Sequence, residues 1–168
     1  SIEPKQGAYN EWGIEVSIWP AGRTVYVSSA AGDDTRDGLT VNTAKKTIAA
    51  GVALLRDGSP DRLLLRMGDT FADGFGGWVK SGLSPEYPMT LGAYGAGAPP
   101  LIQSASRPLQ IMTGPAVPVK HLRIENIEFR PAAGAGSKFF RVMGTVDDLE
   151  IVNCDFTGFE TNLSFQAY

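Results

Sequence analysis

Short runs of alternating hydrophobic and polar residues, separated by Gly and Pro, make up most of the sequence after residue 60. The run RLLLRM at residues 62–67 and the run MTLGAYG at residues 89–95 have the length and composition of β-strands. The alternation of Ile14, Val16 and Ile18 predicts one more strand near the N-terminus. Further strands are predicted at residues 25–27, 77–82, 100–104, 109–113, 121–129, 139–144, 149–156 and 162–165. The pattern therefore indicates a β-dominated chain, and 20 Gly and 11 Pro among 168 residues favour the same conclusion.

One stretch has helical rather than strand periodicity. Residues 43–56 place Ile48, Val52 and Leu55 at helical spacing, and Thr43 is suited to the N-cap position. We predict a helix over this range.

A repeat in the second half of the chain bears on the architecture. Residues 122–129, LRIENIEF, and residues 149–156, LEIVNCDF, share one pattern at an offset of 27 residues. Strands about ten residues apart are typical of a sandwich or barrel, but neither fold explains this repeat. In a parallel β-helix, a residue one coil later lies above its equivalent at the ~4.8 Å strand separation. Asn126 and Asn153 would then point inward at a bend and hydrogen-bond one another as a structural ladder. The alternative is a chance similarity between two strands.

Three motifs in the first half point to a known family. The loop GDDTRDGLT at residues 32–40, the segment TAKKTIAAGVALL at residues 43–55 and the turn GDTF at residues 68–71 follow one another in that order. Together they resemble the N-terminal segment of right-handed parallel β-helix proteins of the pectate lyase-like superfamily. The resemblance covers roughly residues 25–160.

The resemblance implies an all-β fold, a right-handed parallel β-helix (solenoid) with an N-terminal capping α-helix at residues 43–56. Residues 1–24 would form an N-terminal extension or cap strand. Residues 25–168 would form a short β-helix domain that is incomplete at its C-terminal end. We therefore expect the chain to be a piece of a longer protein.

The same resemblance sets the expected function. The superfamily includes polysaccharide lyases, glycoside hydrolases, epimerases, phage tailspikes and proteins without known catalysis. It implies part of a secreted or cell-surface protein of lyase or hydrolase type that acts on acidic polysaccharides or oligosaccharides. A non-catalytic glycan-binding, adhesion or structural module is the alternative, and a truncated solenoid without activity is a third.

Composition limits the partners. The net charge of -3 provides no basic surface for nucleic acid. No apolar run approaches the ~20 residues of a membrane-spanning helix. The single cysteine, Cys154, excludes an internal disulfide, and its alignment with Ile127 predicts a core thiol rather than a nucleophile.

The candidate catalytic residues are Glu128, Asp155 and Arg130. Glu128 and Asp155 are equivalent positions of the repeat, and two stacked carboxylates repel unless one is protonated or a cation lies between them. Hydrolases of this fold need paired carboxylates, whereas a lyase needs a base such as Arg130 and a cation to neutralise the sugar carboxylate. Glu128 and Asp155 are therefore the best candidates for a Ca²⁺ or sugar site, and two solvated carboxylates are the competing interpretation.

Other residues are candidates for weaker reasons. Arg123 stacks above Glu150 as a surface ion pair and is a candidate substrate-binding residue. Trp78 follows two glycines and is a candidate sugar-stacking platform, with burial in the core as its alternative. His121, the only histidine, opens a strand and is expected at a solvent edge rather than as a base.

The loop at residues 32–40 offers Asp33, Asp34 and Asp37 as a second candidate Ca²⁺ site. It lacks the regular alternation and the closing Glu of an EF-hand. A structural turn, in which the aspartates bind their own backbone, is the competing interpretation.

Apolar aromatic residues gather near the C-terminus. We expect them to cover the open end of the solenoid by packing against further coils or against a second copy in a homodimer. They are Phe156, Phe159, Phe165 and Tyr168.

Overall fold

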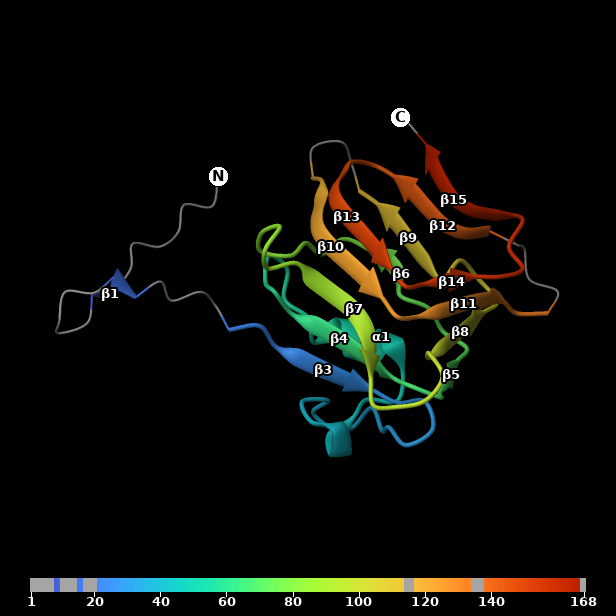
Figure 1. Ribbon diagram of the computed structural model, residues 1–168, viewed down its shortest axis with the longest axis horizontal. Coiled ribbons are helices and arrows are strands. Elements are labelled where there is room, and N and C mark those ends of the chain that lie inside the picture. The colour runs from blue at the N-terminus through green and yellow to red at the C-terminus, as the bar shows by residue number, and fades with distance from the viewer. Residues whose placement is uncertain (1–7, 10–14, 17–20, 114–116, 134–137, 167–168) are drawn as a thin grey trace.

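Three parallel β-sheets form the body of the protein in the computed structural model, which describes residues 8–9, 15–16, 21–113, 117–133 and 138–166 (Figure 1). The first sheet has the strand order β13-β10-β7-β4-β3, the second β14-β11-β8-β5 and the third β15-β12-β9-β6. From β4 onward the chain visits the three sheets in the same order each time, and we call one such passage a coil. The prediction of an all-β chain built from parallel strands is confirmed.

The strands of the first sheet are β3 (Thr24–Val27), β4 (Arg62–Arg66), β7 (Met89–Tyr94), β10 (Val119–Glu125) and β13 (Val146–Val152). Those of the second are β5 (Thr70–Phe71), β8 (Leu101–Ser104), β11 (Glu128–Pro131) and β14 (Asp155–Phe156). Those of the third are β6 (Gly76–Trp78), β9 (Leu109–Met112), β12 (Lys138–Met143) and β15 (Thr161–Gln166).

Equivalent side chains of successive coils lie above one another inside the body. In the first sheet, Leu63, Leu91 and Ile124 are register partners on neighbouring strands, and all three are buried. In the second sheet, Phe129 pairs with Phe156, and their rings stack with centroids 5.5 Å apart. The 27-residue offset of the sequence repeat is thus the number of residues between stacked positions of two successive coils, as predicted. Burial of these columns of apolar side chains is the main stabilising contribution to the fold.

The predicted role of the two asparagines is only partly correct. Asn153 Nδ2 donates to Asn126 Oδ1 at 3.4 Å, so the predicted contact is present. Asn126 is half-buried and Asn153 is exposed, so this contact lies nearer to solvent than a ladder buried in the core would. Both residues have positive φ angles, 59° and 50°, at the corner that follows a strand of the first sheet. Gly68 and Gly95 hold the corresponding corners after β4 and β7, also with positive φ. Asn is the residue besides Gly that adopts this conformation most readily, which explains its place in the repeat.

The helix is shorter than predicted. Helix α1 spans Ile48–Ala53, and Thr47, not Thr43, is its N-cap. Thr43 instead ends a short 3₁₀ turn, η1 (Val41–Thr43). Between them Lys45 donates its backbone N–H to Tyr26 and forms a bridge with β3, so the chain is extended where the first helical turn was expected.

Helix α1 lies against the inner side of the first strands (Figure 1). Ile48 is buried in the same cluster as Val25 and Val27 of β3. Gly51 faces Leu63 and Val27 so closely that an added Cβ would lie 2.6 Å and 2.7 Å from their methyl groups. The helix therefore covers the core at the N-terminal coil, as a cap would.

Near the N-terminus, β1 (Ala8–Tyr9) and β2 (Glu15–Val16) pair antiparallel with each other. They join none of the three parallel sheets. The strand predicted around Val16 is therefore present, while Ile14, Ile18, Trp12 and Trp19 lie outside the described residues. Among the described residues, no helix has the length and apolar character needed to cross a membrane.

Candidate functional site

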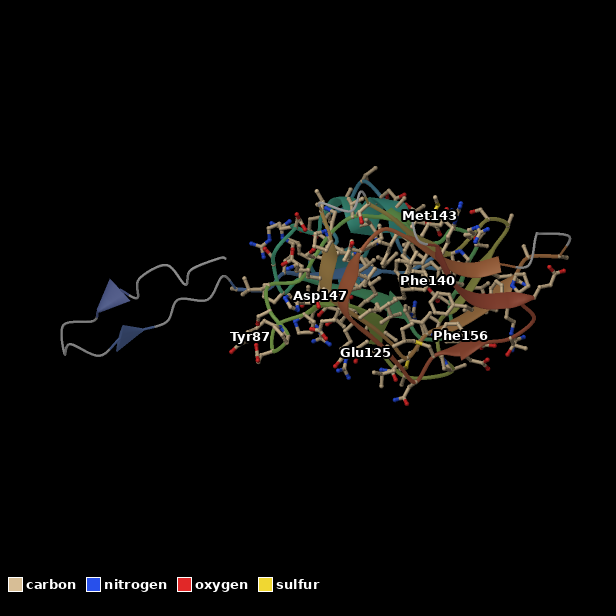
Figure 2. All side chains as sticks on the ribbon, turned by 90° about the horizontal axis from the view of Figure 1, so that it is seen from above. Tyr87, Glu125, Phe140, Met143, Asp147 and Phe156 are labelled. Atoms are coloured by element: carbon tan, nitrogen blue, oxygen red, sulfur yellow. The ribbon has the colours of Figure 1, made fainter. Side chains whose placement is uncertain are left out.

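The outer face of the first sheet carries a set of charged side chains on its last two strands, β10 and β13. Alternation along the strands turns Arg123 and Glu125 of β10 and Glu150 of β13 outward while their neighbours fill the core. Lys120–His121 and Asp147–Asp148 break this alternation, and the second residue of each pair has a positive φ angle. Figure 2 shows Glu125 on the outside of the body and Phe140 inside it. We call this set the charged ladder. It comprises Lys120, His121, Arg123 and Glu125 on β10 and Asp147, Asp148 and Glu150 on β13.

Arg123 is the centre of the charged ladder. Its Nε donates to Glu125 Oε2 at 2.7 Å and its Nη1 donates to Glu150 Oε2 at 2.6 Å, so one guanidinium joins two carboxylates on adjacent strands. The hydrogen bond that Arg123 donates to Glu125 is the main cause that raises the pKa of Arg123. The predicted ion pair with Glu150 is confirmed. A guanidinium has five N–H donors, and two are used here, so others remain to contact a ligand.

The histidine has a partner that the sequence analysis did not predict. His121 Nδ1 lies 2.9 Å from Asp148 Oδ2, and Lys120 Nζ lies 3.8 Å from Asp147 Oδ2. His121 and Asp148 both have positive φ angles, 54° and 61°, at equivalent positions of the two strands. Strained backbone of this kind persists only where the surrounding structure enforces it, and it gathers at functional sites. The pair was missed because the repeat was aligned only from Leu122. Extending the same 27-residue offset upstream matches His121 with Asp148 and Lys120 with Asp147.

Glu128 and Asp155 lie beside the ladder at the start of β11 and β14. They are register partners, as predicted, and both carry a carboxylate. Each carboxylate has a partner two residues later in the chain, since Arg130 forms an ion pair with Glu128 and Thr157 Oγ1 donates to Asp155 at 2.6 Å. The structure thus brings the three predicted catalytic residues together on one short stretch of surface.

Glu128 and Asp155 offer few oxygen ligands for a metal ion. Calcium takes six to eight oxygen ligands, and here two carboxylates share their surroundings with the cationic Arg130. Among the described residues, no group of three or more His, Cys, Asp or Glu side chains is placed to hold a metal ion. Any calcium bound there would need ligands from substrate or water.

The aspartates of the loop at residues 32–40 are engaged by the chain itself. Asp33 accepts hydrogen bonds from the N–H and hydroxyl of Thr35, and Asp37 accepts from Leu39 N–H and Thr43 Oγ1. Asp34 binds groups that are more distant in the sequence. It accepts from the backbone N–H groups of residues 46 and 47 and from the Thr47 hydroxyl. These hydrogen bonds lower the pKa of all three carboxyls. The geometry supports the structural interpretation of the loop.

Trp78 is not available as a sugar platform, and this prediction is corrected. Its side chain is 1% exposed and packs edge-on against Phe75 in the core. The indole Nε1–H donates to Lys80 O at 2.7 Å, which satisfies its only polar group. The two glycines before it are exposed, but the strand alternation turns the ring inward.

Cys154 packs against the core below Ile127, at the position the repeat predicted. Burial raises the pKa of its thiol. A protonated thiol is a poor nucleophile, so its role is packing.

Comparison with known proteins shows which solved structures share this fold. No protein-family model matches the chain, and no curated protein matches it. Among solved structures, it is similar to the GH136 lacto-N-biosidase from Eubacterium ramulus in both a selenomethionine and a native crystal structure. The TM-scores are 0.66 and 0.62 at 24% and 22% sequence identity. The two chains share a fold. The likeness covers 87% and 86% of this chain but 30% of the lacto-N-biosidase chain, so this chain spans less than a third of that enzyme.

Proposed function

We propose that the chain is part of a right-handed parallel β-helix protein of the pectate lyase-like kind, and that it acts on glycans through the charged ladder and the adjoining Glu128, Arg130 and Asp155. The observation that carries this proposal is the shared fold with a lacto-N-biosidase. The successive visits of the chain to three parallel sheets support the β-helix assignment.

Glycoside hydrolysis is the reaction class that we favour. It needs two carboxylates on either side of the scissile bond, one as acid and one as base or nucleophile. Glu125 and Glu150 flank Arg123, and Glu128 and Asp155 stand on neighbouring strands. Strands lie ~4.8 Å apart, which is close to the ~5 Å carboxylate separation of retaining enzymes. The remaining donors of Arg123 would bind sugar hydroxyls or carboxylates.

A lyase reaction on acidic glycans is the second candidate. In that case Arg130, in its neutral form, would take the C5 proton next to the sugar carboxylate. A C4–C5 double bond would form as the C4–O glycosidic bond breaks, and the leaving oxygen would take a proton from water. Ca²⁺ on Glu128 and Asp155 would neutralise the sugar carboxylate. The compact grouping of these three residues supports it. A non-catalytic glycan-binding module is the third, supported by the fact that most ladder carboxylates are already paired with cations.

We also propose that the protein works outside the cell or on its surface, because polymeric glycans are met there. The partner is then a polysaccharide or oligosaccharide. Detection of the protein in the culture medium or on intact cells, by antibody, checks this location, and exclusive recovery from the cell interior would contradict it.

A screen of glycans tests the proposed activity. The chain is incubated with neutral oligosaccharides, polygalacturonate, alginate, glycosaminoglycans and xylans, each with Ca²⁺ and with chelator. New reducing ends without unsaturated product are the expected result. Unsaturated product that disappears with chelator would instead establish the Ca²⁺-assisted lyase. A parallel glycan array separates the binding module from an inert chain. No turnover and no binding would contradict the proposal.

A further inference from the structure

A second site lies away from the charged ladder, at the corner where the first sheet meets the loop at residues 28–42. The structure has a partly open cavity of about 510 Å³ there, within the size range of small-ligand pockets. Its polar lining comes from Ser28, Arg36, Asn42, Arg66 and Tyr94. These residues come from three segments of the sequence, which the coiling of the chain brings together.

The loop that forms one wall is held in shape by its own aspartates. Because Asp33, Asp34 and Asp37 bind N–H and hydroxyl groups of residues 35–47, the loop presents Arg36 from a fixed backbone. Arg36 Nη1 donates weakly to Ala31 O at 3.3 Å and to Asn42 O at 3.4 Å. The side chain is thus positioned across the loop while other guanidinium donors remain for a ligand. This gives the aspartate-rich motif a purpose other than metal binding.

The opposite wall is built by two neighbouring strands. Arg66 at the end of β4 and Tyr94 at the end of β7 are register partners, so the guanidinium and the ring stand side by side. Tyr26 packs edge-on against Tyr94 with centroids 5.1 Å apart and fixes the ring. Burial raises the pKa of Tyr94, so its phenol stays a neutral hydrogen-bond donor at neutral pH. Arg66 is exposed and forms no ion pair with any described residue.

The charge of the pocket is positive although the chain is acidic overall. The lining contains two arginines and no carboxylate, against a net charge of -3 for the whole chain. The buried carboxylate of Asp69, which lies next to the lining residue Ser28, accepts hydrogen bonds from the Ser28 hydroxyl at 2.6 Å and from Ala30 N–H at 3.3 Å. Two guanidiniums converging with a phenol and an amide favour a carboxylate bound through charge-assisted hydrogen bonds.

We infer that this pocket binds the carboxylate of an acidic sugar unit, with Arg66 and Arg36 on the carboxylate and Tyr94 and Asn42 on the ring hydroxyls. Val41, 55% exposed at the rim, offers apolar contact to the sugar ring. The inference does not depend on the charged ladder being a reaction site, because the two regions share no residue.

Isothermal titration with a galacturonic acid trisaccharide tests the inference. The matched neutral galactose trisaccharide and inorganic phosphate are titrated beside it. The acidic sugar is expected to bind at least tenfold more tightly than either, and its affinity is expected to fall with added salt. The variant Arg66→Gln is expected to weaken binding about tenfold, and Arg36→Gln by a similar factor. Arg62→Gln removes the same charge from the same strand outside the pocket and is expected to leave affinity unchanged.

Equal binding of the neutral trisaccharide, or an equal loss in Arg62→Gln and Arg66→Gln, would overturn the inference. Binding of phosphate as tightly as the trisaccharide would identify a simple anion site and overturn the sugar assignment. Absence of acidic-sugar binding would do the same. If the glycan screen fails but the acidic trisaccharide still binds in a way that depends on Arg66, the proposed activity is rejected and the inference about this pocket is retained.

Discussion

The presence of Asn126 and Asn153 is explained better by the backbone conformation at these two positions than by a buried hydrogen-bond network. Both occupy corners with positive φ, where the equivalent corners of earlier coils have Gly68 and Gly95. The amide contact between them is long, at 3.4 Å, and lies near solvent. The backbone requirement is therefore the stronger reason for these asparagines.

Replacement of Asn126 separates the two explanations. Asn126→Ala is expected to lower the free energy of unfolding by about 1 kcal/mol, because alanine has no means to offset the cost of the left-handed conformation. Asn126→Gly removes the same amide but adopts positive φ freely and is expected to stay within about 0.5 kcal/mol of the wild type. Urea denaturation of both variants is the measurement. Equal losses would mean that the amide contact, not the backbone, holds the corner.

At the scale of elements, the buried carboxylate of Asp61 ties three segments together. It accepts hydrogen bonds from the backbone N–H of Arg23 before β3, at 2.7 Å, and of Arg56 after α1, at 2.8 Å. The Arg56 side chain adds an ion pair at 2.6 Å. Burial alone would raise the pKa of Asp61, but these hydrogen bonds outweigh it and hold the pKa below the ordinary 3.8.

Asp61→Asn is expected to lower the free energy of unfolding by about 3 kcal/mol at pH 7, because it leaves buried donors and a cation poorly matched. Since the folded pKa lies below the unfolded one, the stabilisation is present above about pH 3.8 and is lost as the pH falls through the folded value. Denaturation at pH 7 and at pH 3 should therefore show a smaller difference at pH 3. Asp147→Asn, whose carboxylate is exposed, is the control and should change stability by less than about 0.5 kcal/mol. A loss at Asp61 no larger than at Asp147 would contradict this role.

The spacing of coils explains which elements could be predicted from the sequence. Ile124 and Ile151 are 27 residues apart, but the preceding steps of the same column are longer, 33 from Leu91 and 28 from Leu63 to Leu91. Only from β10 and β11 to β13 and β14 is the offset the same, 27 residues, in both the first and the second sheet, so only this stretch appears as a repeat. The two-residue strand β5 was taken for part of a turn, since its length gives no periodic signal. The start of α1 was misplaced because pairing of Lys45 with β3 overrides its helix propensity.

At the scale of the whole molecule, the last coil is open where the earlier ones are closed. Ile151 is 36% exposed, whereas Ile124, its equivalent one coil before, is 1% exposed. Phe156 and Phe159 are likewise only partly buried, while Phe165 and Tyr168 have no described side chains. We propose that a second copy of the chain covers this surface in a homodimer.

Light scattering tests the homodimer. The wild type is expected to be a dimer at micromolar concentration, and Ile151→Glu is expected to be a monomer because a buried, unpaired carboxylate is costly. Leu39→Glu places the same charge at an exposed apolar residue elsewhere and should leave the dimer intact. A monomeric wild type would contradict the proposal.

The candidate sites differ in how much of each could be predicted from the sequence. The stacking of Glu128 with Asp155 and of Arg123 with Glu150 follows from the 27-residue offset alone. The pairing of His121 with Asp148 follows from the same offset extended one residue upstream. The pocket between Arg36 and Arg66 could not be found this way, because its walls come from a loop and from two coils of unequal length.

The central claim is that glycans bind the charged ladder, and the affinity of the best glycan from the array for Arg123→Gln tests it most directly. Arg123 holds both flanking carboxylates and keeps donors for a ligand, so its replacement is expected to weaken binding at least tenfold. Lys46→Gln, which removes one exposed positive charge outside the ladder, should bind as the wild type does. Unchanged affinity in Arg123→Gln, with the fold intact by circular dichroism, would show that the ladder is not the glycan site.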